Sequence, residues 1–200
     1  MNVLLDIIGS TIFVGILIIT ILTVNNNIVM SNYKSISTYE IQTQAVQLGR
    51  IIEYDLYKIG FNVATKANRI TFADTSNITF QADLNNSGTI NSIQYQTGAT
   101  NGSSKNPRDK KLTRIVDGAP LFISFNATRF IMTFYDSAMH KLTTPLSAAD
   151  RLKVRTINVM LQLETPDPVD FVHRLNPDRI DTLYTGAYYE KLISARNLSF

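Results

Sequence analysis

The chain has 200 residues, of which 44% are hydrophobic and 18% are charged, as is ordinary for a protein that buries a core. Its net charge of +3 is small for this length, so charge alone gives no argument for a nucleic-acid partner. Because the sequence contains no cysteine and only two histidines, His140 and His173, disulfides and thiolate metal sites are excluded and little remains for zinc or imidazole chemistry.

The first element is an apolar run at the amino-terminal end. Segment 7–24 contains no charged residue and is about long enough to span a bilayer as a helix. A cleavable signal peptide fits it poorly, because no Lys or Arg precedes the run and no small-x-small site follows it. We therefore expect segment 1–27 to be a retained membrane or filament-core helix. Asp6 is the one charged residue in it, and a carboxylate there is expensive unless it is paired.

The helix is predicted to continue through 28–60 with one apolar stripe. Helical spacing places on that stripe Ile41, Ala45, Leu48, Ile52, Leu56 and Ile59. Gly60 is a typical stop signal, and the triplet 25–27, three asparagines, is expected to loosen the junction between the two halves. Two interpretations stay open: a membrane anchor followed by an ordinary core helix, or a helix that packs against copies of itself.

Charged side chains in the second half of the helix are expected to lie mostly off the apolar stripe. They are Arg50, Glu53, Asp55 and Lys58.

After Gly60 the hydrophobic period changes from 3.6 to 2, which predicts a β-rich domain over 61–200. The predicted strands are 69–73, 77–83, 89–97, 111–116, 128–136, 154–164 and 182–194. Imperfect alternation of Ile90, Ile93 and Tyr95 indicates a bulge, and 98–107 reads as a flexible loop without an apolar anchor. The expected fold is α+β: a long helix, apolar and then amphipathic, packed on a mostly antiparallel sheet.

The longest predicted strand has a clear buried face. In 154–164 that face is predicted to carry Arg155, Ile157, Val159, Leu161 and Leu163.

Two short motifs suggest ligand sites weakly. Asp83, Asn85 and Ser87 have the spacing of a calcium loop, but position 94 is Gln where such a loop has a bidentate Glu. A plain hairpin turn is therefore favoured there, and no metal or other cofactor is expected.

A basic cluster follows the Gly/Ser-rich loop. It consists of Lys105, Arg108, Lys110, Lys111 and Arg114. Such a cluster can contact DNA or an acidic surface. Asp109 interrupts it and no aromatic residue interleaves, so a solvated loop is favoured and a nucleic-acid partner is not expected.

Taken in order, these elements resemble type IV pilins and pseudopilins. RIIEYDLYKIGF (50–61) is similar to the end of the long helix in minor pilins of the PilW-like and pseudopilin J-like type. ITFQADLNNSGTINSIQYQ (78–96) resembles their hairpin, and 134–164 resembles their turn, short helix and long strand. YYEKLISARNLSF (188–200) resembles their carboxy-terminal strand, so the likeness covers nearly the whole chain.

The resemblance implies a structural subunit and not an enzyme. Such a subunit resides in the inner membrane before assembly and then in a periplasmic or extracellular filament, alone or co-assembled with other pilins. In that family an acidic residue near the mature amino terminus, usually Glu, pairs with a neighbouring chain. The resemblance gives this role to Asp6, whose offset depends on where the mature chain begins. The alternative is a single-pass membrane-anchored protein whose globular domain binds a ligand or partner.

Assembly through the helix would use further residues of the apolar run. Gly9 and Gly15 allow close approach of a neighbouring helix, and Ile7, Phe13 and Leu17 supply apolar contacts. The competing interpretation of Asp6 is an interfacial residue near a helix start, where a carboxylate suits the helix dipole.

Overall fold

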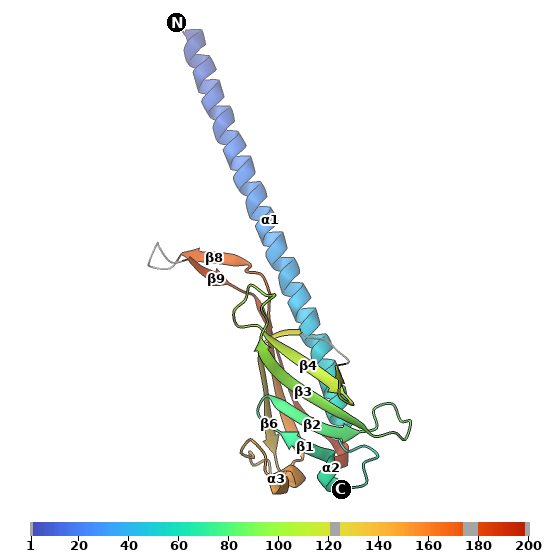
Figure 1. Ribbon diagram of the computed structural model, residues 1–200. Helices are drawn as coiled ribbons and strands as arrows, with labels where there is room; N and C mark the ends of the chain where they lie inside the picture. The colour runs from blue at the N-terminus through green and yellow to red at the C-terminus, as the bar shows by residue number, and fades with distance from the viewer. Residues whose placement is uncertain (1, 121–124, 174–179, 199–200) are drawn as a thin grey trace.

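The computed structural model describes residues 2–120, 125–173 and 180–198 of the chain. Helix α1 (Asn2–Tyr57) packs by its second half on an antiparallel sheet, which confirms the predicted α+β fold (Figure 1). The other elements are α2 (Lys66–Arg69), β1 (Ile70–Ala73), β2 (Asn77–Ala82), β3 (Asn91–Thr100), β4 (Lys110–Val116), β5 (Ala119–Pro120), β6 (Phe125–Tyr135), α3 (Ala148–Lys153), β7 (Thr156–Glu164), β8 (Asp170–His173), β9 (Ile180–Leu183), β10 (Gly186–Ser194) and the 3-10 turn η1 (Arg196–Leu198).

Helix α1 runs through the junction at 25–27 without a break, so the expected loosening there was wrong. The three asparagine side chains are exposed, and solvent can satisfy them without competition for the helical backbone bonds. The first half of α1 projects from the sheet as a single rod, with the two chain ends at opposite ends of the molecule (Figure 1).

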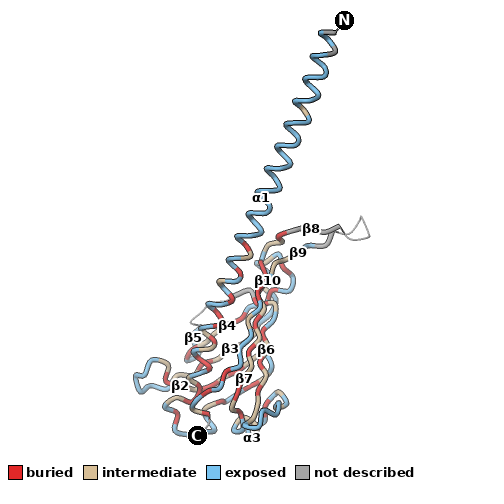
Figure 2. Tube along the Cα trace, turned by 180° about the vertical axis from the view of Figure 1, so that it is seen from behind, coloured by how far each residue is buried: buried red, intermediate tan, exposed pale blue. Residues whose placement is uncertain are grey.

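The predicted apolar stripe of α1 is confirmed. Its six members are 0–4% exposed, and they form one core with the inner face of the sheet (Figure 2). Beyond Tyr57 the chain turns away at Gly60, which has a φ of +76° and donates its N–H to the Gln81 carbonyl oxygen at 2.9 Å. A Cβ at Gly60 would lie 2.8 Å from Cδ of Arg69, so both conformation and space require glycine there.

The main sheet has the strand order β1-β2-β3-β4-β6-β7-β10, with β5 paired to β4, and every pairing among the described strands is antiparallel. On β7 the predicted face is confirmed from Ile157 to Leu163, where alternate residues are 0–1% exposed. Arg155 lies before the strand and is half-buried. The predicted strand 182–194 is two strands, because β9 pairs with β8 in a separate hairpin and β10 pairs with β7.

The bulge expected near Ile90 is also absent from the described β2–β3 ladder. The register is regular from Asn77 opposite Gln96 to Ala82 opposite Asn91, and Ile90 lies before the strand, where its side chain need not alternate. The register shift of β3 lies instead between Thr97 and Thr100, on the side that pairs with β4.

The segment predicted as a flexible loop is tied to the sheet. Strand β3 continues to Thr100, and residues 101–109, here called the anchored loop, bury Asn106 and Asp109 completely. Nδ2 of Asn106 donates to Oε2 of Glu164 on β7 at 2.9 Å. The anchor is polar and not apolar, so hydrophobicity along the sequence could not reveal it.

Candidate functional site

The first half of α1 carries the largest uncovered apolar surface of the described chain. Every residue from Val3 to Ile36 whose side chain is described is exposed, except the half-buried Gly15. This projecting segment reaches a mean hydropathy of 2.6 in an 18-residue window, none of it buried, and the helix is long and apolar enough to cross a membrane. Soluble monomers rarely leave such a surface open, which makes it a candidate surface for contact with lipid or protein.

Four of the six predicted assembly residues share one face of the projecting segment. Asp6, Gly9, Phe13 and Leu17 are spaced by three and four residues, which places them along one stripe. Phe13 is 65% exposed and Leu17 44%. No atom lies within 4 Å of a Cβ built on Gly9, so this position is an open notch between larger side chains.

The other two predicted assembly residues lie on other faces of the helix. Ile7 is 59% exposed and lies one residue from Asp6, about 100° around the helix. Gly15 lies on the side opposite to the Asp6 stripe and also has no atom within 4 Å of a built Cβ. A bundle of parallel helices offers neighbours on several sides, so the two faces would meet different copies.

Hydroxyls of the apolar run are satisfied within the helix. Those of Ser10, Thr20 and Thr23 each donate to the carbonyl oxygen four residues earlier, at 2.6–2.9 Å. The Asp6 carboxylate has no hydrogen-bond or ion-pair partner in the described part of the chain. The first Lys or Arg of the sequence is Lys34, about 42 Å along the helix.

A buried polar cluster fastens α1 to the sheet, and the sequence pattern missed it. Asp55 is 2% exposed and accepts hydrogen bonds from Nε of Arg114 at 2.6 Å and from the Tyr95 hydroxyl at 2.7 Å. Burial and the Asp55 carboxylate raise the pKa of Tyr95 well above its ordinary value. Asp55 was expected off the apolar stripe, yet its spacing from Ile52 and Ile59 puts it on the buried side, which was the available signal.

A second contact fastens α1 to the edge strand β10. The Tyr189 ring packs on Gly49, where a built Cβ would lie 2.6 Å from ring carbons. The Tyr189 hydroxyl donates to Oε2 of Glu53 at 3.1 Å, and Nζ of Lys191 lies 3.3 Å from Oε1 of the same carboxylate. Burial and this hydrogen bond raise the pKa of Tyr189 to about 12.

The predicted basic cluster is not one surface. Lys105 pairs with Asp167 at 2.8 Å. Arg114 belongs to the Asp55 cluster, and only Lys110 and Lys111 are exposed without a partner in the described ranges.

Arg108, the remaining member, faces the end of β7. Its guanidinium pairs with Glu164 at 2.8 Å and lies over the Tyr184 ring. Structural roles therefore account for three of the five cations of the cluster.

The weak calcium-loop candidate is a hairpin turn, as the sequence favoured. The Asp83 carboxylate accepts the N–H groups of Ser87 and Gly88 at 3.0 and 2.9 Å and the Asn62 amide at 2.8 Å. Burial opposes the charge, but these hydrogen bonds outweigh it and hold the pKa of Asp83 below its usual value. No group of three His, Cys, Asp or Glu side chains within the described residues could hold a metal ion.

The projecting segment is therefore the candidate functional surface. It is helical from Asn2, apolar on all sides up to Val24, and carries one unpaired carboxylate. No protein-family model, no curated protein and no solved structure matches this chain.

Proposed function

We propose that this chain is a structural subunit of a type IV pilus-like or pseudopilus filament and assembles through its projecting segment. The observation that carries the proposal is the uncovered apolar surface of α1 from Val3 to Ile36 on a body whose own core is complete without it. A bilayer covers such a helix before assembly, and parallel copies cover it afterwards. The subunit would reside in the inner membrane and then in a periplasmic or extracellular filament, alone or with other pilins.

Asp6 and Gly9 favour assembly over a simple anchor. An anchor needs only apolar length, and an unpaired carboxylate weakens it. In a bundle, the same carboxylate meets a cation of a neighbouring chain, for which the amino terminus is the nearest candidate. Such a pair fixes the axial register of the copies, which is the best-attested use of a buried polar group. The open notch at Gly9, on the same face, lets the neighbouring backbone come close.

Electron microscopy of the full chain purified from membranes tests the proposal. Helical polymers are expected for the unchanged chain. Asp6→Ala is expected to lower the filament yield by about 100-fold, because a buried ion pair that loses one partner costs about 3 kcal/mol. Asp6→Glu keeps the carboxylate and should retain filaments, and Ser10→Ala, one turn away, should leave the yield unchanged.

Discrete micelle-bound monomers at every concentration would overturn the proposal in favour of a single-pass anchor. An Asp6→Ala chain that forms filaments as well as the unchanged chain would overturn the role of Asp6 in setting the register.

A further inference from the structure

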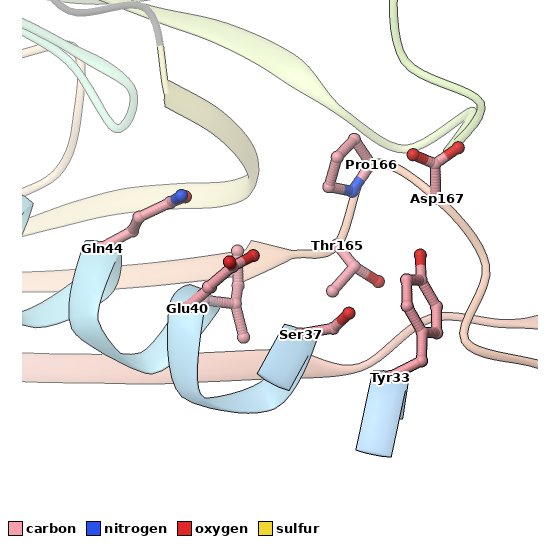
Figure 3. Close-up of a pocket in the computed structure, with 8 residues that line it drawn as sticks. Tyr33, Ser37, Glu40, Gln44, Thr165, Pro166 and Asp167 are labelled. Atoms are coloured by element: carbon pink, nitrogen blue, oxygen red, sulfur yellow. The ribbon is translucent and has the colours of Figure 1, made fainter. Parts of the chain in front are cut away.

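A polar pocket lies at the neck, the place where α1 leaves the sheet. The neck pocket has a volume of about 150 Å³, opens to solvent and is lined by two segments (Figure 3). Its lining residues are Tyr33, Ser37, Glu40, Ile41 and Gln44 of α1 and Thr165, Pro166 and Asp167 after β7. Pockets for drug-sized ligands or cofactors measure about 300–1,000 Å³. The neck pocket therefore suits a group no larger than a side chain.

Ser37 contributes a hydroxyl to this pocket. It is 8% exposed, and its hydroxyl points into the pocket (Figure 3). Other hydroxyls of the same stretch of α1, those of Ser35 and Thr38, donate to the carbonyl oxygen one turn back. The Ser37 hydroxyl has no partner in the described chain, and its oxygen is open to solvent in the pocket. A group that enters the pocket can take the place of water and bond this hydroxyl.

The charge of the pocket selects the class of that group. Two carboxylates line it, and Asp167 is already paired with Lys105 of the same chain at 2.8 Å. Glu40 has no partner among the described residues, which leaves one uncompensated negative charge facing the pocket (Figure 3). An anion is repelled here. A metal ion lacks the third carboxylate or histidine that would hold it in the described chain.

An ammonium group matches the pocket by charge, size and hydrogen bonding. It offers three donors, and the acceptors that line the pocket include the Glu40 carboxylate and the Ser37 hydroxyl. A charge-assisted bond to a carboxylate is about twice as strong as a neutral one. A lysine side chain carries such a group on a stem narrow enough for an opening between one helix and one strand end.

We propose that the neck pocket binds the ammonium group of Lys110 or Lys111 from a neighbouring copy; this rests on the filament proposed above. These two lysines are exposed and unpaired in the described chain. They follow the anchored loop, whose Lys105 and Ser104 contact Asp167 and Pro166, so they lie at the neck end of the sheet. In the proposed filament, a helical step that brings the neck of one copy beside that of a neighbour lets cation and pocket meet.

Charge reversal tests the pairing in filaments of the full chain. Glu40→Lys alone, and K110E/K111E alone, are each expected to lower the filament yield by about fivefold or more, because like charges then face each other. The combination of the three substitutions should restore it. Lys141→Glu is the matched control, since Lys141 is exposed at the other end of the sheet and should not matter. Thermal unfolding of each variant should match the unchanged chain, because Glu40 and both lysines lack partners in the body.

Cross-linking gives a second readout, because the chain has no cysteine of its own. Gln44→Cys and Lys111→Cys chains, assembled together, should form a dimer with a short bismaleimide. Gln44→Cys with Lys141→Cys should form none.

The outcomes separate the two proposals. Filaments that tolerate both charge reversals overturn the neck-pocket pairing and leave the filament proposal standing. Equal cross-linking of Gln44→Cys to Lys111→Cys and to Lys141→Cys does the same. A charge swap that fails to restore the yield also counts against the pairing. If the unchanged chain forms no filaments, the proposed function fails and the pairing falls with it.

Discussion

The two halves of α1 are one continuous helix with opposite relations to their surroundings. In the projecting half Ile12 is 58% exposed, whereas in the half that lies on the sheet Ile52 is 1% exposed. Both halves have helical sequences, so secondary structure does not distinguish them. The distribution of apolar residues does: they lie all around the first half and on one stripe of the second. The first half is therefore left uncovered by the described chain, and the second is covered by it.

The polar groups of the two halves of α1 also differ in what they bond. Hydroxyls of the projecting half bond their own backbone, as in Ser10 and Thr20, and leave the surface uniform toward any partner. Charged groups of the packed half bond particular residues of the sheet, as Asp55 does with Arg114. The projecting half thus makes few specific contacts within the described chain, and the packed half is fixed in one orientation on its own body.

Truncation of the same residue type in each half gives the largest expected contrast. Ile52→Ala should lower the free energy of unfolding of the body by about 2–5 kcal/mol, because it leaves a cavity between helix and sheet. Ile12→Ala should change it by no more than about 0.5 kcal/mol. Thermal unfolding of both variants in detergent, followed by near-UV circular dichroism, measures the difference. Equal losses would show that the projecting half contributes to the stability of the body.

Removal of the buried Asp55 carboxylate should have the next largest effect on the free energy of unfolding. Asp55→Ala leaves the Arg114 guanidinium and the Tyr95 hydroxyl without their acceptor, at a cost of about 3 kcal/mol. Lys153→Ala removes an exposed ion pair with Asp150 and should cost no more than about 0.5 kcal/mol. Urea unfolding of the two variants checks this. Similar midpoints for both would mean that the buried cluster adds nothing to the attachment of α1.

Glycines in the two halves should respond differently to a methyl group. Gly49→Ala pushes a Cβ against the Tyr189 ring and should lower the free energy of unfolding by about 1–2 kcal/mol, after the gain in helix propensity. Gly9→Ala meets no atom of the chain and should leave the unfolding of the body unchanged, while it lowers the filament yield. Unfolding curves and micrographs of both variants separate the effects, and a filament defect in Gly49→Ala with normal unfolding would contradict this division.

The smallest effect concerns the phenol that joins β10 to α1. Tyr189→Phe removes the hydrogen bond to Glu53 and should cost about 1 kcal/mol at neutral pH. The pKa of Tyr189 is about 12 in the fold and about 10 in the unfolded chain, so the fold retains its proton at a pH where the unfolded chain loses it. This contribution is therefore complete below pH 10 and is lost between about pH 10 and 12. Melting temperatures across that range should fall more steeply for the unchanged chain than for Tyr189→Phe.

Periodicity predicted the helix, its buried stripe, its stop at Gly60 and most strands of the sheet. These features depend on which side of an element faces the core, and the local spacing of apolar residues determines that side. The separate β8–β9 hairpin and the junction at 25–27 were not predicted correctly, because pairing partners and side-chain exposure are settled by the whole fold.

The polar contacts were harder to predict than the apolar ones. Asp55 and Arg114 are 59 residues apart in the chain, and Asn106 meets Glu164 across 58 residues. No local sequence pattern predicts such pairs. The exposure of the projecting segment could be predicted from sequence, because its apolar residues lie on all sides of the helix; the assembly roles of its residues stay predictions. The neck pocket could not be predicted, since it forms only where α1 passes the end of β7.

The unbroken helix through the asparagine triplet makes the projecting segment a lever arm. From Ser37 to Asn2 it extends about 52 Å, so a tilt of about one degree at the neck moves its tip by about 0.9 Å. The contacts at Gly49 and Asp55 therefore limit how far the tip of the helix moves relative to the body. If the proposed filament forms, a substitution deep in the body would make the position of the tip less certain and slow assembly without altering a single residue of the tip.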